Sequence, residues 1–516
     1  MKKHILLISV IAALSLAACA TSGQSSKEDS KIDETSIVDE GSDISEVHDS
    51  SASTKSSSSE KSSSEKSSSE KTSSEVPISS SSSENPKPEG ESNENFTLMG
   101  IDNLSSMSLN CKKYVDDMRA QQKKLIQEKG VNADYYINDL YGTNGVDLTY
   151  GVESGDNGGY RKGNVKNDYL DPVDAKWEDG EKSDESKGIE IEWKPADSLK
   201  GQEYTILYGM KEDLSDATEI KTNNTKYSIK NLLVNQKYYY KVKVGTAESP
   251  LANFTTGDYP RWIDARPMFN VRDAGGYMTS SGKRIKQGLV FRGGEITDKV
   301  GWTANSWSSY TGDVGGRYTD SNGKMVDQHI TSQTEASKKV FRETMNMVGG
   351  LEIDLRSSTE RNGYTACGFA NSNDISYKLV SLNSYEKGLA QTDLVKQIFN
   401  DFANVDTKPV YYHCYGGADR TGTIGFLLGA LLGMSYTDLV IDFELTSYSS
   451  NPSRNYRSHL RNGPYNRWPT MISELQNKFG FSSSKTIMAA TENYLKSNCG
   501  VSQSTIDAIR AKMLED

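Results

Sequence analysis

The chain has 516 residues, which is room for two or three domains, and it carries a formal net charge of −11. Most of that charge lies between residues 20 and 95, where 17 acidic residues face 7 basic ones, so the rest of the chain is close to neutral. This distribution lacks the basic footprint that nucleic-acid binding requires, and we expect no nucleic-acid partner.

Residues 1–18 have the pattern of a signal peptide. Lys2 and Lys3 form a positive start, and the apolar stretch over 5–16 is too short to span a bilayer. The sequence Leu16-Ala17-Ala18-Cys19 resembles the lipobox of bacterial lipoproteins. The resemblance implies that Cys19 is acylated and holds an extracytoplasmic protein at the cell membrane. The alternative is a plain secretory peptide that is followed by an accidental cysteine.

Residues 19–95 are rich in Ser, Glu and Lys. The pentapeptide Ser-Ser-Ser-Glu-Lys repeats between Ser57 and Lys71, and no aromatic residue occurs in this stretch before Phe96. Such a composition cannot bury a core, so the sequence predicts a disordered linker that tethers the following domains.

Residues 96–167 have no pattern that indicates a function. The spacing of apolar residues predicts a helix from Ser108 to Gly130, and a Gly-rich run over 142–163 ends any regular element after it. We expect this partly helical segment to pack against a neighbouring domain.

Residues 168–257 show the alternation of a β-sandwich. The runs 189–193, 204–208 and 238–244 alternate apolar and polar residues and are separated by turn residues. The segment is similar to a fibronectin type III domain: Trp193 stands where the strand-B tryptophan would be. Leu232 and Tyr238 look like the leucine and tyrosine of the corner before strand F. Such a module is expected to be a spacer or a weak binder.

Residues 258–516 alternate between strand and helix patterns and predict an α/β domain. A helix is expected over Thr331–Met347 and a strand over Leu351–Leu355. The stretch from Gly301 to Asp327 has the composition of an insertion. Its aromatic residues could wall or cover a substrate ring, or simply anchor a long loop; they are Trp302, Trp307, Tyr310 and Tyr318.

The most informative stretch of this domain is His413-Cys414-Tyr415-Gly416-Gly417-Ala418-Asp419-Arg420-Thr421-Gly422. An apolar strand pattern over 409–412 precedes it, and an apolar helix pattern over 423–432 follows it. A loop that enters a helix N-terminus offers unpaired N–H groups to an oxyanion and stabilises a thiolate. Arg420 can hold two phosphate oxygens at once. The loop therefore predicts a phosphate pocket with Cys414 as nucleophile.

These residues resemble the Cys-x5-Arg protein tyrosine phosphatases, and most closely the bacterial group that acts on phosphotyrosine and sometimes on phosphoinositides. Three further motifs of that group occur in the same order. They are Asn270-Val271-Arg272-Asp273-Ala274-Gly275-Gly276 followed by Gly288–Gly294, Asp354-Leu355-Arg356-Ser357 with Glu360, and Asp442-Phe443-Glu444-Leu445-Thr446. The resemblance implies a central sheet flanked by helices, with a phosphate-binding loop, after a fibronectin type III-like all-β sandwich and a disordered tether.

The expected reaction is hydrolysis of a phosphomonoester through a cysteinyl-phosphate on Cys414. Thr421 can donate its hydroxyl to the sulfur, and His413 can fix the loop. No cofactor or metal is expected, since no cluster has metal-ligand spacing. The phosphate is expected to contact Tyr415, Gly416, Gly417, Ala418, Asp419 and Arg420.

The general acid is ambiguous in the sequence. Many tyrosine phosphatases carry an aspartate on a loop before the cysteine, and here Asn383 stands in the corresponding segment. The resemblance favours Asp419, inside the phosphate loop. Asp354, at the end of a strand, is the second candidate, although it can instead pair with Arg356 or cap a helix.

Ala418 stands where better-known members of the group have lysine. Without that charge we expect a phosphotyrosine protein or a small phosphomonoester to be preferred over a phosphoinositide. The alternatives are an inositol-phosphate phosphatase and a catalytically weak surface protein that binds phosphorylated ligands. Three further cysteines, Cys111, Cys367 and Cys499, are expected to be packed thiols, with a Cys367–Cys414 disulfide as a redox lock less favoured.

Overall fold

The computed structural model describes residues 89–107, 109–130, 132–136, 152–153, 160–161, 188–265, 268–296, 317–319, 325–327, 335–358, 360–361, 366–369, 372–404, 408–448, 468–482 and 484–515. All of them belong to one compact unit, residues 83–516. The predicted signal peptide, Cys19 and the linker up to residue 88 lie outside the described residues. Of the helices that the structure describes, none is both long and apolar enough to span a bilayer.

Two antiparallel sheets occupy the segment before residue 257. One has the order β1-β2-β5-β8 and the other β10-β9-β6-β7, with β11 on β9. Their bounds are β1 Glu89–Ser92, β2 Phe96–Met99, β5 Ile189–Pro195, β6 Tyr204–Gly209, β7 Thr218–Thr222, β8 Lys226–Ile229, β9 Lys237–Val244, β10 Ala247–Glu248 and β11 Ala252–Thr255. Alternate side chains of both sheets share one apolar core, where Trp193 packs edge-on against Tyr204. The three predicted strands are confirmed as β5, β6 and β9.

The predicted boundaries of the linker and of the sandwich are wrong. β1 lies inside the predicted linker, and β2 pairs with β5, so the sandwich begins at residue 89 and residues 100–187 separate two neighbouring strands of one sheet. β1 is an edge strand that is held by backbone hydrogen bonds, which need no apolar side chain and leave no compositional signal. Phe96, the first residue after the predicted linker, packs in the sandwich core.

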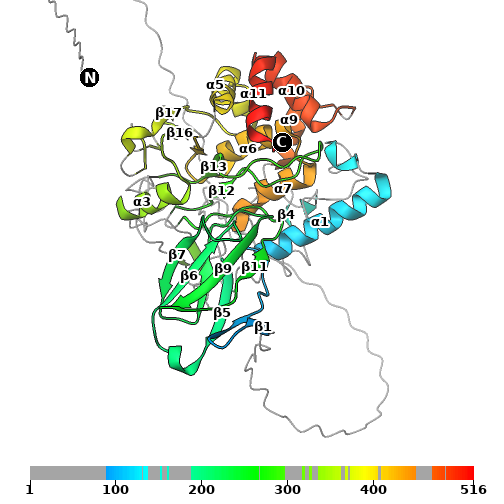
Figure 1. The fold of residues 1–516 in the computed structure, drawn as a ribbon. Coiled ribbons are helices and arrows are strands. Elements are labelled where there is room, and N and C mark those ends of the chain that lie inside the picture. The colour runs from blue at the N-terminus through cyan, green and yellow to red at the C-terminus, as the bar shows by residue number, and fades with distance from the viewer. Residues whose placement is uncertain are drawn as a thin grey trace, which may run out of the picture. The chain divides into compact units, whose positions relative to one another are not determined.

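Helix α1 (Leu109–Lys129) and the short helix η1 (Ala133–Tyr135) follow β2 along the chain. The predicted helix is confirmed, and its apolar side chains recur at helical spacing and enter the core of the C-terminal segment, residues 258–516. They are Cys111, Tyr114, Val115, Met118 and Leu125. α1 contacts α7 (Tyr436–Glu444), as Figure 1 shows. The expectation that this segment packs against a neighbouring domain is therefore confirmed.

Asp134 of η1 is fully buried against the N-terminus of α7. It accepts hydrogen bonds from Gln122 at 2.6 Å and from the Thr437 hydroxyl at 2.9 Å. Burial raises the pKa of Asp134 to about 6, helped by the charge of Asp438 and opposed by these hydrogen bonds. Since its pKa is higher in the folded than in the unfolded state, its contribution to stability is present below pH 4 and is lost as the pH rises through about 6.

The variant Asp134→Asn should therefore gain stability relative to wild type as the pH rises from 4.5 to 7.5. The expected gain is up to about 3 kcal/mol, from a shift of about two pKa units. Urea unfolding of both proteins at the two pH values measures it. Glu343→Gln, at an exposed ion pair with Lys339, is the control and should show no such trend. A difference that stays constant with pH would contradict this role of Asp134.

A five-stranded sheet forms the centre of the C-terminal segment, in the order β12-β13-β18-β16-β17. β13, β18, β16 and β17 are parallel, and β12 is antiparallel to β13. The bounds are β12 Arg272–Asp273, β13 Val290–Gly293, β16 Leu351–Asp354, β17 Ser376–Leu379 and β18 Val410–His413. Gly293, His413 and Asp354 are register partners, so the carboxyl ends of three strands meet at one edge.

Helices cover both faces of this sheet. Tyr411 packs on one face with Phe341 of α3 and Phe369, while Tyr412 packs on the other with Phe402 of α5. Neighbouring residues of a strand point to opposite faces, so the predicted α/β architecture is confirmed. The helices are α3 Glu335–Thr344, α4 Tyr385–Leu389, α5 Thr392–Ala403, α6 Asp419–Leu432, α7 Tyr436–Glu444, α9 Trp468–Lys478, α10 Ile487–Ser497 and α11 Gln503–Met513. The short helices are η3 Asp197–Leu199, η4 Ser372–Asp374 and η5 Leu445–Tyr448, and the hairpins are β3 Val152–Glu153 with β4 Tyr160–Arg161 and β14 Arg317–Thr319 with β15 Met325–Asp327.

The loop between β8 and β9 is hydrogen-bonded to the C-terminal segment. The buried guanidinium of Arg261 donates to the carbonyl of Asn231 at 2.8 Å and to the carboxylate of Asp273 at 2.7 Å. The side-chain amide of Gln287 donates to the carbonyl of Val234 at 3.0 Å and accepts from its N–H at 2.8 Å. These paired polar groups connect the sandwich directly to the strand that carries Arg272 and Asp273.

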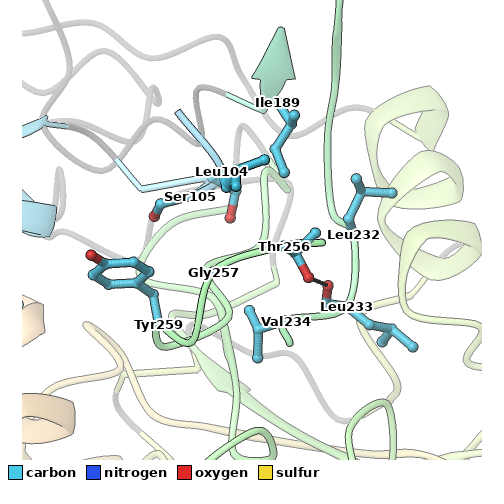
Figure 2. Close-up of a pocket in the computed structure, with 10 residues that line it drawn as sticks. Leu104, Ser105, Ile189, Leu232, Leu233, Val234, Thr256, Gly257 and Tyr259 are labelled. Carbon is cyan, nitrogen blue, oxygen red and sulfur yellow. Dashed lines mark hydrogen bonds between the residues drawn. The ribbon is translucent and has the colours of Figure 1, made fainter. Parts of the chain in front are cut away.

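Figure 2 shows a small cavity beside this connection. The Thr256 hydroxyl donates to the carbonyl of Leu233 at 2.7 Å, and the N–H of Gly257 donates to the carbonyl of Leu104 at 2.7 Å. The cavity has a volume of about 10 Å³, which holds one water at most. The sandwich, which the sequence suggested to be a spacer, is therefore hydrogen-bonded to the C-terminal segment through Arg261 and Gln287.

Candidate active site

The stretch with Cys414 connects the central strand of the sheet to helix α6. β18 ends at His413, residues 414–418 form the loop, and α6 begins at Asp419. The predicted strand is confirmed, whereas the helix begins earlier than the predicted 423, so Arg420 lies in its first turn. Cys414 is 2% exposed. The thiol therefore lies at the carboxyl edge of the parallel strands and at a helix N-terminus, where an α/β sheet usually binds anions.

Gly417 is the residue that lets the loop close against the neighbouring strand. Its φ is +66°, in the left-handed region that favours glycine. A Cβ atom at this position would lie 2.4 Å from the carbonyl carbon of Gly293. Both the conformation and the space therefore require glycine here.

Asn270 holds the carbonyl groups of the loop. Its side-chain amide donates to the carbonyls of Gly416 and Gly417, both at 3.1 Å, and Arg292 also donates to the Gly417 carbonyl at 3.2 Å. In a trans peptide the N–H points away from the C=O. Because these carbonyls are directed to Asn270 and Arg292, the N–H groups of Gly417 and Ala418 point to the other side, where they can bind an oxyanion.

Two buried arginines and one carboxylate support this arrangement. Asp442 of α7 accepts from Arg272 at 3.3 Å and from Arg292, and both guanidinium groups are 1% exposed. Arg272 also donates to the side-chain oxygen of Asn270, and the Asn270 amide lies 3.3 Å from the Thr446 hydroxyl. Burial and the neighbouring Arg292 lower the pKa of Arg272. Two of the three further motifs, those of Asn270 and Asp442, thus converge behind the loop.

Arg420 forms a two-point ion pair with Glu360, in which each terminal nitrogen donates to one carboxylate oxygen. Burial would raise the pKa of Glu360, but the bonds and charge of Arg420, together with Ser357, lower it to about 2. The pair is therefore charged at neutral pH. A guanidinium has five N–H donors, so Arg420 is oriented by two and keeps the others for a ligand.

His413 is fully buried and fixes the start of the loop. Its Nε2 is 3.0 Å from Glu352 Oε1, and its Nδ1 is 3.2 Å from the carbonyl oxygen of Cys414. These positions agree with the expectation that His413 acts on the loop rather than on the substrate. Glu352 also accepts from the N–H of Gly368 at 2.7 Å.

Asp354 is bound on all sides and is a poor candidate for the general acid. It accepts from Arg356 Nε at 2.9 Å and Nη2 at 2.7 Å, and from the Tyr377 hydroxyl at 2.9 Å. Burial would raise the pKa of Asp354, but the charge of His413 and the hydrogen bonds and charge of Arg356 lower it to about 2. Both of its carboxylate oxygens are occupied by Arg356 or Tyr377, so neither is left to carry a proton to a leaving group. The structure shows the other role that the sequence allowed for Asp354, which is an ion pair with Arg356.

Glu352, Asp354 and His413 are the residues in the described segments that bring ligand atoms together as a metal would need, within 4.8 Å of one another. Each is already engaged, since His413 is bonded to Glu352 and Asp354 to Arg356. The guanidinium supplies the positive charge that a cation would otherwise bring. That the reaction needs no metal or cofactor stays a prediction.

Asp419 is the first residue of α6 and is partly exposed beside the loop. The hydroxyl of Tyr385 donates to its Oδ1. Thr421 is fully buried, and its hydroxyl has no hydrogen-bond partner among the residues that the structure describes. The predicted bond from Thr421 to the sulfur of Cys414 is therefore not made in this structure. Ala418 is also buried, at 1% exposure.

The remaining cysteines are free thiols. Cys111 and Cys499 are buried and Cys367 is half-buried, and none of the described cysteines is in a disulfide. Burial and the neighbouring Glu352 raise the pKa of Cys367, so it stays a protonated thiol. The expectation of packed thiols is confirmed. The aromatic residues Trp302, Trp307 and Tyr310 lie outside the described residues, and Tyr318 lies in β14.

Sequence reasoning assigned no role to several residues that build this site. Asn270, Arg272, Arg292, Asp442 and Thr446 lie in motifs that were recognised only as sequence resemblances. The sequence feature that could have identified them is a polar residue beside apolar ones in a strand or helix pattern, since it indicates a buried polar group that must have a partner. Tyr385 has no such feature, because it stands among other polar and aromatic residues.

The comparisons with known proteins agree with this geometry. A family model described as "Tyrosine phosphatase family" matches residues 263–304 and 313–515. No curated protein matches the chain. The match covers the five-stranded sheet, the loop of Cys414 and the helices up to α11. The part of the chain that contains the Cys414 loop is therefore similar to the tyrosine phosphatase family over residues 263–304 and 313–515.

Proposed function

We propose that the C-terminal domain hydrolyses phosphomonoesters through a cysteinyl-phosphate on Cys414. The observation that carries the proposal is the loop between β18 and α6. There the carbonyls of Gly416 and Gly417 are held by Asn270, and Arg420 is oriented by Glu360. The arrangement offers a thiol, inward N–H donors and a fixed guanidinium to one phosphate group.

In the first step the sulfur of Cys414 attacks phosphorus, an S–P bond forms, and the ester P–O bond breaks. The loop N–H groups and Arg420 hold the equatorial oxygens as charge redistributes. Asp419 gives its proton to the leaving oxygen. In the second step water attacks phosphorus and gives a proton to Asp419, and the S–P bond breaks. Inorganic phosphate and the thiolate are the products.

The proposed substrate is a phosphotyrosine protein or a small phosphomonoester. The small, buried Ala418 brings no positive charge to the loop, and a polyanionic inositol lipid would gain less there than at a lysine. Two other functions remain as alternatives: an inositol-phosphate or phosphoinositide phosphatase, and a catalytically weak surface protein that binds phosphorylated ligands.

We further propose that the protein is held outside the cytoplasm by lipidated Cys19 and a disordered linker, with a fibronectin type III-like sandwich beside the catalytic domain. The lipobox-like sequence supports the anchor. The hydroxyl of Tyr238 accepts from the N–H of Leu233 at 3.0 Å, as the tyrosine of a corner before strand F does, and supports the likeness of the sandwich. If Cys19→Ala leaves the protein in the membrane fraction, the anchor is wrong.

The activity is tested with the purified full chain, because the bonds of Arg261 and Gln287 argue against cutting it at residue 258. Phosphate release is measured from a phosphotyrosine peptide, a phosphoinositide and inositol hexakisphosphate. We expect the peptide to have the highest kcat/KM, by about tenfold or more, as the loss of one favourable charge contact suggests. After acid quenching, phosphate is expected on the peptide that contains Cys414. Preference for inositol hexakisphosphate would support the first alternative instead.

A further inference from the structure

Tyr385 is held to the N-terminal part of α6 by two hydrogen bonds. Its backbone N–H donates to the Thr423 hydroxyl at 3.0 Å, and that hydroxyl donates to the carbonyl of Asp419 at 2.9 Å. Its phenolic hydroxyl donates to Asp419 Oδ1. The ring is 7% exposed and packs at a tilt against Phe443, with ring centroids 6.5 Å apart. The side chain is thus fixed in both position and direction.

The backbone of Tyr385 has an unusual conformation. Its φ is +53°, in the left-handed region that bulky residues rarely adopt. Such a conformation persists where the surrounding structure enforces it, and it occurs most often at functional sites. Glycine or asparagine would adopt it without strain, yet neither could bring a phenolic hydroxyl to Asp419. The strain and the hydrogen bond are two separate observations at one residue.

The two oxygens of the Asp419 carboxylate differ in their contacts. The charge of the next residue, Arg420, interacts with those of Asp419 and Cys414, and Arg420 is paired with Glu360. Tyr385 occupies Oδ1, and Oδ2 has no hydrogen-bond partner among the described residues. Oδ2 is therefore the oxygen that is available to carry a proton to a leaving group.

We propose that Tyr385 is a positioning residue for the general acid: it holds Asp419 so that Oδ2 faces the leaving oxygen of the substrate. The inference rests on the proposed function, with Asp419 as the acid. Tyr385 comes two residues after Asn383, in the segment where the sequence resemblance would place an acidic residue. In this chain the segment contributes the Tyr385 hydroxyl, which orients the acid, and it does not contribute the acid itself.

The test compares leaving groups in the full chain. Protonation matters greatly for a basic phenolate and little for p-nitrophenolate, so a residue that acts through the acid affects phenyl phosphate selectively. Tyr385→Phe keeps the ring and removes the hydroxyl. We expect kcat/KM, which reports the step that releases the leaving group, to fall about tenfold with phenyl phosphate and less than about twofold with p-nitrophenyl phosphate, a part of the 10²- to 10⁴-fold effect of a general acid. In the Asp419→Asn background the same change should have no further effect.

Tyr494→Phe is the matched control. Tyr494 lies in α10, and its hydroxyl donates to the carbonyl of Leu389, the last residue of α4, at 2.7 Å. The variant therefore removes a tyrosine hydroxyl that is bonded to α4 without touching Asp419. It should change the two rates equally or not at all. An equal loss with both substrates in Tyr385→Phe, or the same loss in the Asp419→Asn background, would overturn this inference alone. A wild type that hydrolyses neither substrate would overturn the proposed function and this inference with it.

Discussion

Replacing Cys414 with serine is expected to lower kcat for p-nitrophenyl phosphate by about 10⁴-fold or more, as loss of a covalent nucleophile does elsewhere. A serine hydroxyl stays protonated at neutral pH and is a far weaker nucleophile. The surrounding loop gives it no base, since His413 is engaged with Glu352 and with the carbonyl of residue 414. Steady-state kinetics on the purified protein measure the loss.

The same variant should still bind phosphate, which separates chemistry from recognition. The inward N–H groups of the loop and Arg420 are unchanged in Cys414→Ser, so a phosphotyrosine peptide should be retained on it. Arg420→Ala should not retain the peptide. It removes the guanidinium that would hold the phosphate oxygens, and it leaves the carboxyl group of Glu360 without its partner.

Equal, slow hydrolysis by wild type and Cys414→Ser would contradict the enzyme and favour the phospholigand-binding alternative. Binding by Arg420→Ala as strong as that of Cys414→Ser would place the ligand outside this loop. Isothermal titration with the phosphotyrosine peptide distinguishes these results.

The strands and helices that face a core were predictable because their apolar residues repeat with a clear period. This is true of the central strand β18, of β5 and β9 in the sandwich, and of α1. The edge strand β1 was not predictable, since its pairing uses the backbone alone. The start of the sandwich was also not predictable. Strands that pair are usually close in sequence, whereas β2 pairs with β5 across a long stretch of chain.

The catalytic loop was predictable for a different reason: its chemistry is local, within ten residues of sequence. The groups that hold the loop are not local. Asn270 reaches Gly416 across 146 residues, and Arg292 reaches Asp442 across 150. A single sequence shows that such residues are polar, but not which partner each finds. The contact of Tyr385 with Asp419 depends on a positive φ and could not be inferred from the sequence at all.

Replacing Asp442 with asparagine is expected to destabilise the protein by about 3–5 kcal/mol, the cost of leaving a buried charge without its partner. Asp442 is the carboxylate shared by Arg272 and Arg292, and both guanidinium groups are 1% exposed. An asparagine is neutral, and since the two arginines bond different carboxylate oxygens, the NH₂ group of the asparagine would face one of them. Urea unfolding at pH 7 measures the change in the free energy of unfolding.

Glu492→Gln provides the control, because Glu492 and its partner Arg510 are each 25% exposed. An ion pair open to solvent contributes about 0–1 kcal/mol, so this variant should be close to wild type. A loss in Asp442→Asn as small as in the control would mean that the two arginines are neutralised by other groups. The expected large loss should also lower kcat/KM, since Arg292 and Asn270, which Arg272 holds, keep the carbonyls of the loop turned away from the phosphate. Stability and activity then fall together because one carboxylate secures both.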